Sequence, residues 1–380
     1  MKVVTISLDP KMLDSESVPA LRARRYGTIV DLYSVIVPTP ALVTTRLSDS
    51  VMVYGVGGRL KIVRLWNVYK QILKLVREGK CDVLSSSDIY FIGCIALCVA
   101  RTYHLGFELQ VLGIEKLSPF RRIFFSYVLK HTQVIRALSE RIKERIITEF
   151  GIERERIHVV TIYVDVSTLG LSERSLPEQE RVACEKLVGA FKEQYGNRMN
   201  FLTVSRLVPI KRIENILHAV RKISREDASV LLHIVGDGPE RKSLEKVVVN
   251  FGIEQHVIFH GYQSGYALGV LYSECDCFVL ASEYEGWSMV VIEAATSGLP
   301  VIMTDVGCAG EFIIAEESGI IIPVSDIRAL TVAMERIMHE PKLRTKLSEG
   351  VIRQLATLPR FDAILEEYKR NWKRTLQHIQ

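Results

Sequence analysis

Short apolar runs alternate with longer amphipathic stretches through the first half of the chain. Compact apolar runs between polar residues favour strands, whereas apolar residues that recur every three or four positions favour helices. Strands and helices of these lengths in alternation indicate parallel β-α-β units. The expected strands are Lys2–Ser7, Leu32–Val37, Val51–Tyr54, Asp82–Ser85, Phe107–Leu112, Gln133–Ala137 and Ile157–Ile162. The expected helices are Ile62–Arg77, Ile89–Tyr103, Pro119–Lys130 and Ser139–Phe150.

The alternation resumes in the second half, after a polar segment with one amphipathic stretch. We therefore expect two α/β domains, over residues 1–171 and 200–360, with a connecting segment over 172–199 and a C-terminal helix over 361–380 that returns to the first domain. The expected strands are Phe201–Val204, Val230–Val235, Val257–His260, Cys277–Leu280, Val301–Thr304 and Gly319–Ile322. The expected helices are Ile213–Ser224, Glu240–Asn250, Ser264–Ser273 and Ser288–Ser297, followed by a mostly helical tail from Ile327.

The composition is that of a globular protein with two buried cores. At about 150 residues per domain, the 380 residues correspond to two domains. Hydrophobic residues make up 48% of the chain and charged residues 24%, which is ordinary for globular domains. The net charge of +5 does not by itself predict nucleic-acid binding, and we expect none.

The cysteines and the hydropathy favour a cytoplasmic protein. Seven cysteines without a paired spacing are typical of reduced thiols. The first residues form a strand pattern broken by charge, which is not a signal peptide. The longest apolar run, Ile89 to Ala100, is shorter than the ~20 residues that a membrane-spanning helix needs.

The segment from Ser282 to Pro300 carries the strongest chemical signal. It follows the strand Cys277–Leu280, and Ser288 stands where a helix N-cap is expected. The first amides of that helix have no partner within it, so they form a phosphate-binding end. Glu285 precedes the helix, and Glu293 lies in its apolar second turn, where a carboxylate needs partners such as ribose hydroxyls. The alternative is a structural glutamate that caps a neighbouring loop.

Basic residues follow the first strand of the second domain. Arg206 and Lys211 come just after Val204, at the carboxyl end of a parallel strand, where ligands of such sheets bind. Two fixed positive charges there would neutralise a diphosphate leaving group. The alternative for either residue alone is an ordinary solvated side chain.

Glycines follow two further strands. Gly236 opens a Gly-x-Gly turn before a helix, which allows close approach of the backbone. A dinucleotide fingerprint requires a third glycine, so NAD binding is not supported. Gly261 and Tyr262 form a similar turn, and Gly307 to Glu311 would add amides or a carboxylate near the sugar. A plain turn remains the alternative for each of them.

In combination these segments resemble the donor-binding domain of the family-4 glycosyltransferases. The resemblance covers about Phe201 to Pro323 and rests on S-R-L-V-P-I-K, V-G-D-G-P, F-H-G-Y, E-G-W-S-M-V-V-I-E-A, S-G-L-P-V-I and G-C-A-G-E. It implies the GT-B fold, in which two Rossmann-like α/β domains face each other across a cleft. It also implies a retaining glycosyltransferase of hexosyltransferase type, which moves a sugar from a UDP-, GDP- or ADP-sugar to a glycan or lipid-linked glycan.

The resemblance further implies the role of each site residue. Arg206 and Lys211 would hold the diphosphate, Glu293 the ribose, and Glu285 the transferred sugar. The nucleotide sugar is a co-substrate, so no cofactor is expected, and no metal is required; no Asp-x-Asp metal motif stands out. The remaining donor-binding candidates are Gly286, Met289, Val290, Val291, Gly236, Gly261 and Tyr262.

The chain departs from the family pattern at several positions. Ser205 and Arg212 stand where the family has glycines, and the region after the first strand has no glycine-rich loop. A glycine-rich piece, Gly55 to Gly58, occurs later instead. Leu112 replaces a histidine that the family often has on the acceptor side. These differences bear on acceptor positioning and leave the donor-site residues in place.

The first half resembles the acceptor domain of bacterial polysaccharide glycosyltransferases over about Glu108 to Asp165. Gly113 and Glu115 are the acceptor-side candidates of this segment. Basic residues alternate with aromatic ones between Lys116 and Arg145, which is typical of a helix on an anionic membrane surface. The equally open alternative is a helix with its aromatic residues in the core. The enzyme is thus expected in the cytoplasm, with possible contact to the inner face of the plasma membrane.

Two other functions stay open on the sequence alone. A sugar-nucleotide epimerase can share the two-domain fold, but it needs acid and base groups that the sequence does not identify. A non-catalytic module that binds sugar nucleotides would account for the altered glycines and for Leu112. The clustered glutamates and basic residues favour the glycosyltransferase, since a fold alone does not define a function.

Overall fold

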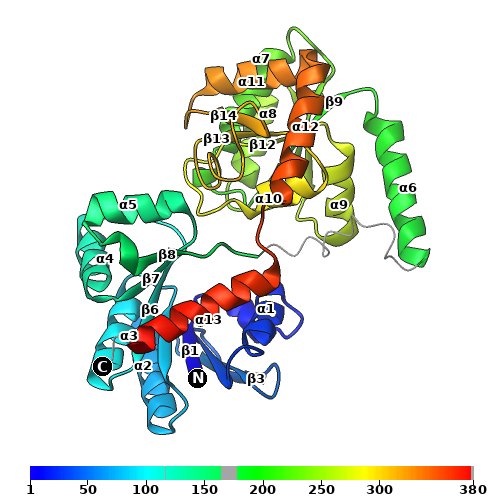
Figure 1. Cartoon of the computed structure of the whole chain (residues 1–380). Helices are drawn as coiled ribbons and strands as arrows, with labels where there is room; N and C mark the ends of the chain where they lie inside the picture. Colours follow the sequence, from blue (N-terminus) through cyan, green and yellow to red (C-terminus); the bar gives the residue numbers. More distant parts are fainter. Residues whose placement is uncertain (116, 164–177, 378–380) are drawn as a thin grey trace. The chain divides into compact units, whose positions relative to one another are not determined.

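The computed structural model describes residues 1–115, 117–163 and 178–377, which form two compact units. The first unit comprises Met1–Tyr163 and the chain from Pro359 onward, and the second comprises Val164–Leu358. The expected boundary at residue 171 lies outside the described residues. Each unit is a parallel-sheet α/β domain of Rossmann-like type (Figure 1).

The first unit contains an eight-stranded sheet in the order β3-β4-β2-β1-β5-β6-β7-β8. All neighbouring strands are parallel except β3 and β4, which form an antiparallel pair at one edge. The chain runs outward from β1 to β2 and β4, and then returns to place β5 on the other side of β1. The strands are β1 Lys2–Ile6, β2 Leu32–Val37, β3 Leu42–Arg46, β4 Val51–Val56, β5 Val83–Ser86, β6 Gly106–Val111, β7 Val134–Ala137 and β8 Ile157–Val159.

Helices cover both faces of this sheet. One core cluster joins α1 and α13 to side chains of β1, β2 and β4, while α2 and α3 pack on the sheet as well, α2 against β2 and β4 and α3 against β5 and β6. The α-helices are α1 Val18–Tyr26, α2 Lys61–Arg77, α3 Phe91–Thr102, α4 Pro119–His131, α5 Glu140–Phe150 and the C-terminal α13 Phe361–Gln377.

A buried polar network attaches α13 to the first sheet. The indole Nε1 of Trp372 donates to Glu108 Oε2 at 3.1 Å, and Ser85 Oγ donates to the same oxygen at 2.6 Å. Arg136 donates to the Gln110 side chain at 2.6 Å and lies over the ring of Tyr368 on α13. Buried charges are costly unless they are hydrogen-bonded. Here each charged group has at least one partner, although Glu108 Oε1 and Arg136 Nε have none in the described structure.

The second unit contains a six-stranded, fully parallel sheet in the order β11-β10-β9-β12-β13-β14. Apolar side chains of α7, α8 and α11 form a core with one face of this sheet, and α9 and α10 pack on strands β9, β12 and β13. The strands are β9 Met199–Val204, β10 Val230–Val235, β11 Val257–Gly261, β12 Cys277–Leu280, β13 Val301–Thr304 and β14 Gly319–Ile322. The α-helices are α6 Glu178–Tyr195, α7 Ile213–Ile223, α8 Arg241–Phe251, α9 Gly265–Glu274, α10 Met289–Thr296, α11 Ile327–His339 and α12 Pro341–Leu355.

Three features differ from the sequence-based expectation. Strand β3 and helix α1 were not predicted, and the strand expected over Ile157–Ile162 ends at Val159. Helix α6, which lies in the expected connecting segment, packs against α9 of the second unit. All seven cysteines are free thiols. Among the residues the structure describes, no helix combines the length and hydropathy of a membrane span.

Candidate active site

The site candidates of the second unit gather where the strand order reverses. From β9 the chain moves to β10 and β11 on one side, and then returns to β12 on the other side of β9. In open parallel sheets such a reversal opens a crevice at the carboxyl ends of the two central strands, and ligands bind there. Arg206 and Lys211 follow β9, and Glu285 follows β12, so the fold brings these segments to one position.

Lys211 and Glu285 form an ion pair at this position. The Lys211 Nζ lies 2.6 Å from Glu285 Oε1, which also accepts a hydrogen bond from Ser282 Oγ at 2.7 Å. The side chains are only 21% and 11% exposed, so water screens the pair less than it would at the surface. Glu285 Oε2 accepts no hydrogen bond from the described residues, which leaves it available to a ligand.

Backbone contacts between the loop after β9 and the loop after β12 hold Lys211 and Glu285 beside each other. Lys211 closes the short 3-10 helix η5, Pro209–Lys211, and Glu283 donates its backbone N–H to the Ile210 carbonyl at 2.8 Å. Arg212 and Glu283 form a second, more exposed ion pair beside the first. Thr304 of β13 donates to the Ser282 carbonyl at 2.7 Å and so fixes the start of the loop.

The N-terminus of α10 differs from its expected form. Ser288 occupies the N-cap position with a left-handed φ of +72°, and its side chain caps no helix N–H. Its Oγ is buried without a hydrogen-bond partner in the described structure. Gly307 leaves room for this hydroxyl, because a Cβ there would lie 2.3 Å from that oxygen. Ser288 therefore presents a buried, unpaired hydroxyl rather than a cap.

The amides of this helix end are only partly free. Val291 donates its N–H to the Ser288 carbonyl at 3.0 Å, which corrects the expectation of three unpaired amides. The N–H groups of Met289 and Val290 have no acceptor among the described residues. These two amides and the helix dipole still favour an anion at this end.

Glu293 is held by a tyrosine that the sequence did not single out. Tyr272 of α9 donates its hydroxyl to Glu293 Oε2 at 2.9 Å. Burial raises the pKa of the Glu293 carboxyl, and the hydrogen bond from Tyr272 opposes that rise. Burial also raises the pKa of Tyr272 far above its usual value, so the phenol remains a donor. A partly desolvated carboxylate with one fixed donor has capacity for further hydroxyl donors.

The glycines after β10 serve loop packing more than ligand approach. A Cβ at Gly236 would lie 1.8 Å from the Ser205 carbonyl, and one at Gly238 2.3 Å from the Leu207 carbonyl. The Gly236 N–H already donates to the Gly261 carbonyl at 2.7 Å. These glycines thus let the loop after β10 pack against the loop after β9, which carries Arg206.

The remaining donor-side candidates lie at the same edge of the sheet. Arg206 is exposed, and its guanidinium forms no ion pair or hydrogen bond with the described residues, although its carbonyl accepts from the Val208 N–H at 2.9 Å. Gly286 is half-buried, and Tyr262, just past β11, is 72% exposed. Gly261 has a left-handed φ of +67°, which explains the glycine in this turn. The structure unites Lys211 with Glu285 and leaves Arg206 unpaired beside them.

The acceptor-side candidates lie in the first unit, after β6. Glu115 and Leu112 are exposed, and Gly113 is half-buried. An aromatic residue, Tyr90, lies near them, and the Arg121 guanidinium lies 5.1 Å from the centroid of its ring. Burial raises the pKa of Tyr90, and the negative charge of Glu115 makes a smaller contribution in the same direction. No charged pair comparable to Lys211–Glu285 forms here within the described residues.

The basic segment between 116 and 145 does not form one charged surface. Arg136 is buried in the network under α13, which corrects its expected place on that surface. The aromatic residues of α4 lie on different faces of the helix: Phe125 is buried in the core, whereas Phe120 is 60% exposed. Lys116 lies outside the described residues. The exposed basic residues of this helix are Arg121, Arg122 and Lys130.

Three contributors to the site escaped the sequence analysis. Tyr272 lies in an apolar helix outside any motif, and Ser282 opens the segment with the strongest signal, but its hydrogen bond to Glu285 was not predicted. The Arg212–Glu283 pair joins segments far apart in the chain, for which local spacing gives no signal. Among the described residues, no group of three or more His, Cys, Asp or Glu side chains is arranged as a metal site.

Two family models match consecutive parts of the chain. Residues 30–168 match "Glycosyltransferase Family 4", and residues 190–354 match "Glycosyl transferases group 1". The paired α/β units with a site at the β9/β12 reversal define a protein of the GT-B class. The chain belongs to the family-4 glycosyltransferases of the GT-B fold.

A curated relative shows the extent of the sequence similarity. N-acetyl-alpha-D-glucosaminyl L-malate synthase of Bacillus anthracis is 29% identical over 194 residues, which cover 50% of each chain. The matched segments span 42%, 50% and 64% of the lengths of three such relatives. The chain thus matches about half the length of these proteins.

Solved structures show the same fold across nearly the whole chain. Sucrose-phosphate synthase of Thermosynechococcus elongatus has a TM-score of 0.79 at 17% identity, and 99% of each chain is covered. Anabaena HepE, solved with UDP and glucose, has a TM-score of 0.76 at 15% identity. That match covers 98% of this chain and 100% of HepE. At these identities the similarity shows the fold alone.

Proposed function

We propose that this protein transfers a sugar from a nucleotide-diphosphate donor to a hydroxyl of a glycan or lipid-linked glycan, with retention of the anomeric configuration. The observation that carries the proposal is the half-buried Lys211–Glu285 pair beside the N-terminus of α10, at the strand-order reversal of the second sheet. Cation, carboxylate and free amides are the groups that a sugar diphosphate needs, and they meet in one place.

Glu293 is the proposed ribose ligand. Its carboxylate is partly desolvated and fixed by Tyr272, so two adjacent ribose hydroxyls would satisfy its remaining acceptor capacity. The solved complex of HepE with UDP and glucose supports a nucleotide-sugar donor for a protein with this fold. The donor base of this protein is taken as uracil, guanine or adenine, to be resolved by binding.

The diphosphate is assigned to the groups around Lys211. The Lys211 ammonium supplies a positive charge, which is paired with Glu285 in the protein without ligand. The exposed Arg206, the amides of Met289 and Val290 and the unpaired hydroxyl of Ser288 supply further donors. Preorganised donors of this kind stabilise charge as it develops, without reorganisation during the reaction.

The proposed reaction is a displacement on the donor face of the sugar. The bond from the anomeric carbon to the diphosphate oxygen breaks, and a bond from that carbon to the acceptor oxygen forms on the same side. The leaving diphosphate takes the proton of the acceptor hydroxyl, so no separate protein base is required. The transferred sugar is assigned to Glu285, whose Oε1 is already bonded to Ser282 and whose Oε2 is available for a sugar hydroxyl.

Charge stabilisation by side chains makes a metal ion unnecessary in this proposal. Lys211 and Arg206 provide two positive charges for the diphosphate, together with the positive end of the α10 dipole. Transfer should therefore persist after exhaustive treatment with a chelator. A strict dependence on added divalent cations would contradict this part of the proposal.

Contact with an anionic membrane is proposed for the exposed side of α4. Arg121, Arg122 and Lys130 lie beside exposed apolar residues, of which Ile123 is 68% exposed. A basic and apolar helix face of this kind suits a lipid surface. More of the protein should sediment with phosphatidylglycerol vesicles than with neutral vesicles. This difference should disappear in the Ile123→Asp variant. Equal binding of the wild type to both vesicle types would contradict the proposed membrane contact.

The transfer reaction is tested with a panel of UDP-, GDP- and ADP-sugars. A donor at 100 times its dissociation constant should raise the free energy of unfolding by about 2.7 kcal/mol. The donor identified in this way is then incubated with a panel of glycan acceptors, and NMR coupling constants of the product report the anomeric configuration. No stabilisation by any nucleotide sugar would reject the proposal, and an inverted product would reject retention alone.

A further inference from the structure

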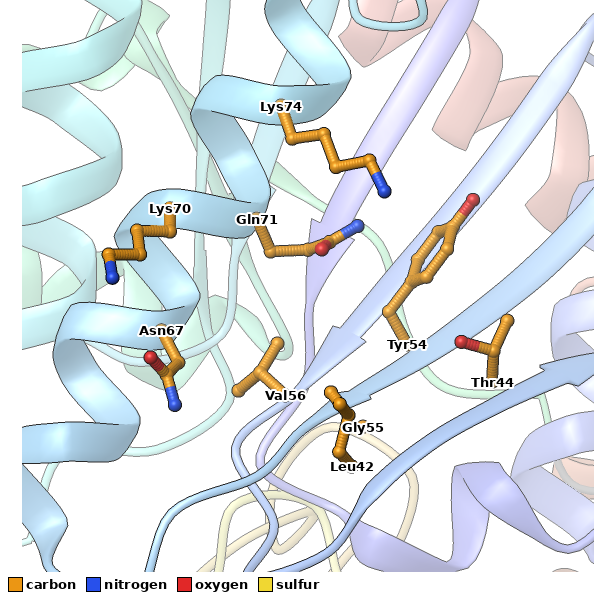
Figure 2. Close-up of a pocket in the computed structure, with 9 residues that line it drawn as sticks. All are labelled: Leu42, Thr44, Tyr54, Gly55, Val56, Asn67, Lys70, Gln71 and Lys74. Carbon is orange, nitrogen blue, oxygen red and sulfur yellow. The ribbon is translucent and has the colours of Figure 1, made fainter.

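A pocket in the first unit lies between the β3–β4 ribbon and α2 (Figure 2). It has a volume of about 300 Å³, at the lower end of the range for small-ligand sites. The pocket forms because α2 packs against β2 and β4, while the antiparallel edge strand β3 is left largely exposed. Thr44 and Tyr54 face each other across β3 and β4 and form part of its wall.

The lining is rich in hydrogen-bond donors that lack partners. Gln71 Nε2 is buried without a hydrogen bond in the described structure, and a buried donor left unsatisfied is destabilising. The hydroxyls of Thr44 and Tyr54 form no hydrogen bond with the described residues either. Asn67 is fixed from the α2 side, because its Nδ2 donates to the Gly57 carbonyl at 3.2 Å. No carboxylate is among the lining residues.

One lysine supplies a positive charge to this pocket. Figure 2 shows the Lys74 ammonium and the Gln71 amide extending from α2 toward Tyr54, whereas the Lys70 ammonium points away. Lys70 instead lies over the Trp66 ring, 5.5 Å from its centroid. Lys74 forms no ion pair within the described residues, since the nearby Glu78 carboxylate pairs with Lys80 at 2.7 Å.

From this arrangement we infer that the pocket binds an oxyanion carried by a hydroxylated ligand, such as a polyol phosphate or a uronate. Lys74 would contact the oxyanion, and the Gln71 amide with the two hydroxyls would contact ligand oxygens, because charged acceptors form the stronger hydrogen bonds. The glycine-rich segment Gly55 to Gly58, which begins within β4 and which the transfer chemistry does not use, supplies Gly55 to the wall of the pocket.

This site is separate from the proposed reaction. Four strand spacings separate β4 from β6, after which the acceptor-side candidates lie, and this corresponds to about 19 Å across the sheet. The donor-site residues belong to the other unit. The inference therefore stands or falls independently of the transfer activity.

The test is calorimetric titration of the whole protein with glycerol phosphate and with glucuronate. Glycerol and glucose serve as their uncharged counterparts, and saturating UDP blocks any phosphate binding at the second sheet. We expect the charged ligands to bind and the uncharged ones not to bind. Comparison of the two charged ligands shows whether phosphate or carboxylate is preferred.

Matched variants locate the binding. Lys74→Gln should weaken the binding of the charged ligands at least about fivefold, because the variant loses one solvent-accessible hydrogen bond to a charged group. Gln71→Met, which keeps the shape but removes the donor, should weaken it about threefold. Lys222→Gln is the control, because Lys222 is also an exposed lysine in the last turn of a helix but lies in the other unit.

The affinities of the three variants decide whether the ligand binds beside Lys74 and Gln71. Weakening in Lys74→Gln and Gln71→Met with an unchanged Lys222→Gln supports the site. Equal affinity in wild type and Lys74→Gln, equal loss in Lys222→Gln, or no binding of either charged ligand overturns it. Unfolding curves of each variant establish that a loss of binding is not a loss of fold.

Discussion

The carboxyl edges of the two sheets occupy equivalent places in their domains but are built differently. In the second unit, Lys211 and Glu285 are paired and half-buried at the strand-order reversal. In the first unit, the corresponding reversal lies between β1 and β5. Asp88 follows β5, and its Oδ1 already accepts hydrogen bonds from backbone N–H groups at the start of α3, including that of Tyr90 at 2.9 Å. Exposed and aromatic residues such as Phe91 surround it.

Under the proposed function, this difference divides donor binding and acceptor binding between the two sheets. A diphosphate requires charges fixed before it binds, because a preorganised site loses little on reorganisation. The second sheet provides this with an ion pair that closely packed loops support. An acceptor whose chemistry varies between relatives needs a surface that can change without disturbing such pairs, and exposed loops meet that need.

The largest expected effect separates the two glutamates of the loop after β12. Glu285→Gln should lower kcat/KM for transfer at least about 100-fold, because it removes the charged partner of Lys211 and the proposed charged contact to the sugar. Glu283→Gln breaks the neighbouring, more exposed pair with Arg212 and should cost no more than about threefold. Equal losses in steady-state assays would show that the half-buried pair has no special role.

A substitution at Gly307 tests how the loops support the second edge. In Gly307→Ala the new Cβ would lie 2.9 Å from Glu285 Cβ, in addition to the clash with Ser288, at a left-handed φ of +56°. We expect donor affinity to fall about tenfold and stability to fall by about 2–3 kcal/mol. Calorimetry and chemical denaturation measure the two effects.

Gly310→Ala is the control for backbone strain. Gly310 also has a left-handed φ, +78°, but no atom lies within 4 Å of the added Cβ. Its stability should fall by only about 1 kcal/mol, with donor affinity unchanged. If both variants lost affinity equally, backbone strain rather than the contact with the Ser288 loop would explain the effect.

The pH dependence of donor binding tests Glu293. Burial raises the pKa of this carboxyl, so the ionised form, which is proposed to accept ribose hydroxyls, is lost at a higher pH than in an unburied glutamate, as the pH falls through the raised pKa. Donor affinity should fall with it, by about tenfold between the ionised and neutral forms. Glu293→Gln should remove most of this pH dependence.

Tyr272→Phe sharpens the same prediction. The hydrogen bond from Tyr272 lowers the pKa of Glu293, so its removal should raise that pKa further. The decline in affinity should then begin at a higher pH than in wild type. An unchanged profile in titrations across pH would mean that Glu293 does not contact the donor.

The smallest expected effect concerns the first edge. Arg121→Ala removes the guanidinium over Tyr90 and should raise the acceptor KM severalfold, while donor affinity stays within about twofold. Arg122, the next residue on α4, lies over Phe150 instead and serves as the control. A loss of donor affinity in Arg121→Ala would contradict the division of tasks between the sheets.

Much of the fold is readable from the sequence because continuous apolar runs mark the central strands. Val230–Val235, for example, is a fully buried strand with the predicted bounds. The edge strand β3 escaped prediction because its residues are mostly exposed and show no apolar face. Helix α1 escaped as well, since its arginines obscure the few buried residues, such as Ala20 and Ala23.

For the site, sequence reasoning located the segments but not their contacts. The motifs placed Lys211 and Glu285 at strand ends, yet their pairing depends on β9 and β12 being neighbours in the sheet. The space for the Ser288 hydroxyl depends on Gly307, which comes from the loop after β13, whereas propensity alone predicted Ser288 as an ordinary cap. Tertiary neighbours decide such details, and local pattern does not contain them.

Hydrogen exchange in the presence of UDP tests the central claim most directly. If the second sheet holds the donor, UDP should slow amide exchange in residues 205–212 and 283–293 and leave residues 86–91 and 112–115 unchanged. Protection confined to the first sheet's carboxyl edge, or no protection at saturating UDP, GDP and ADP, would contradict the account.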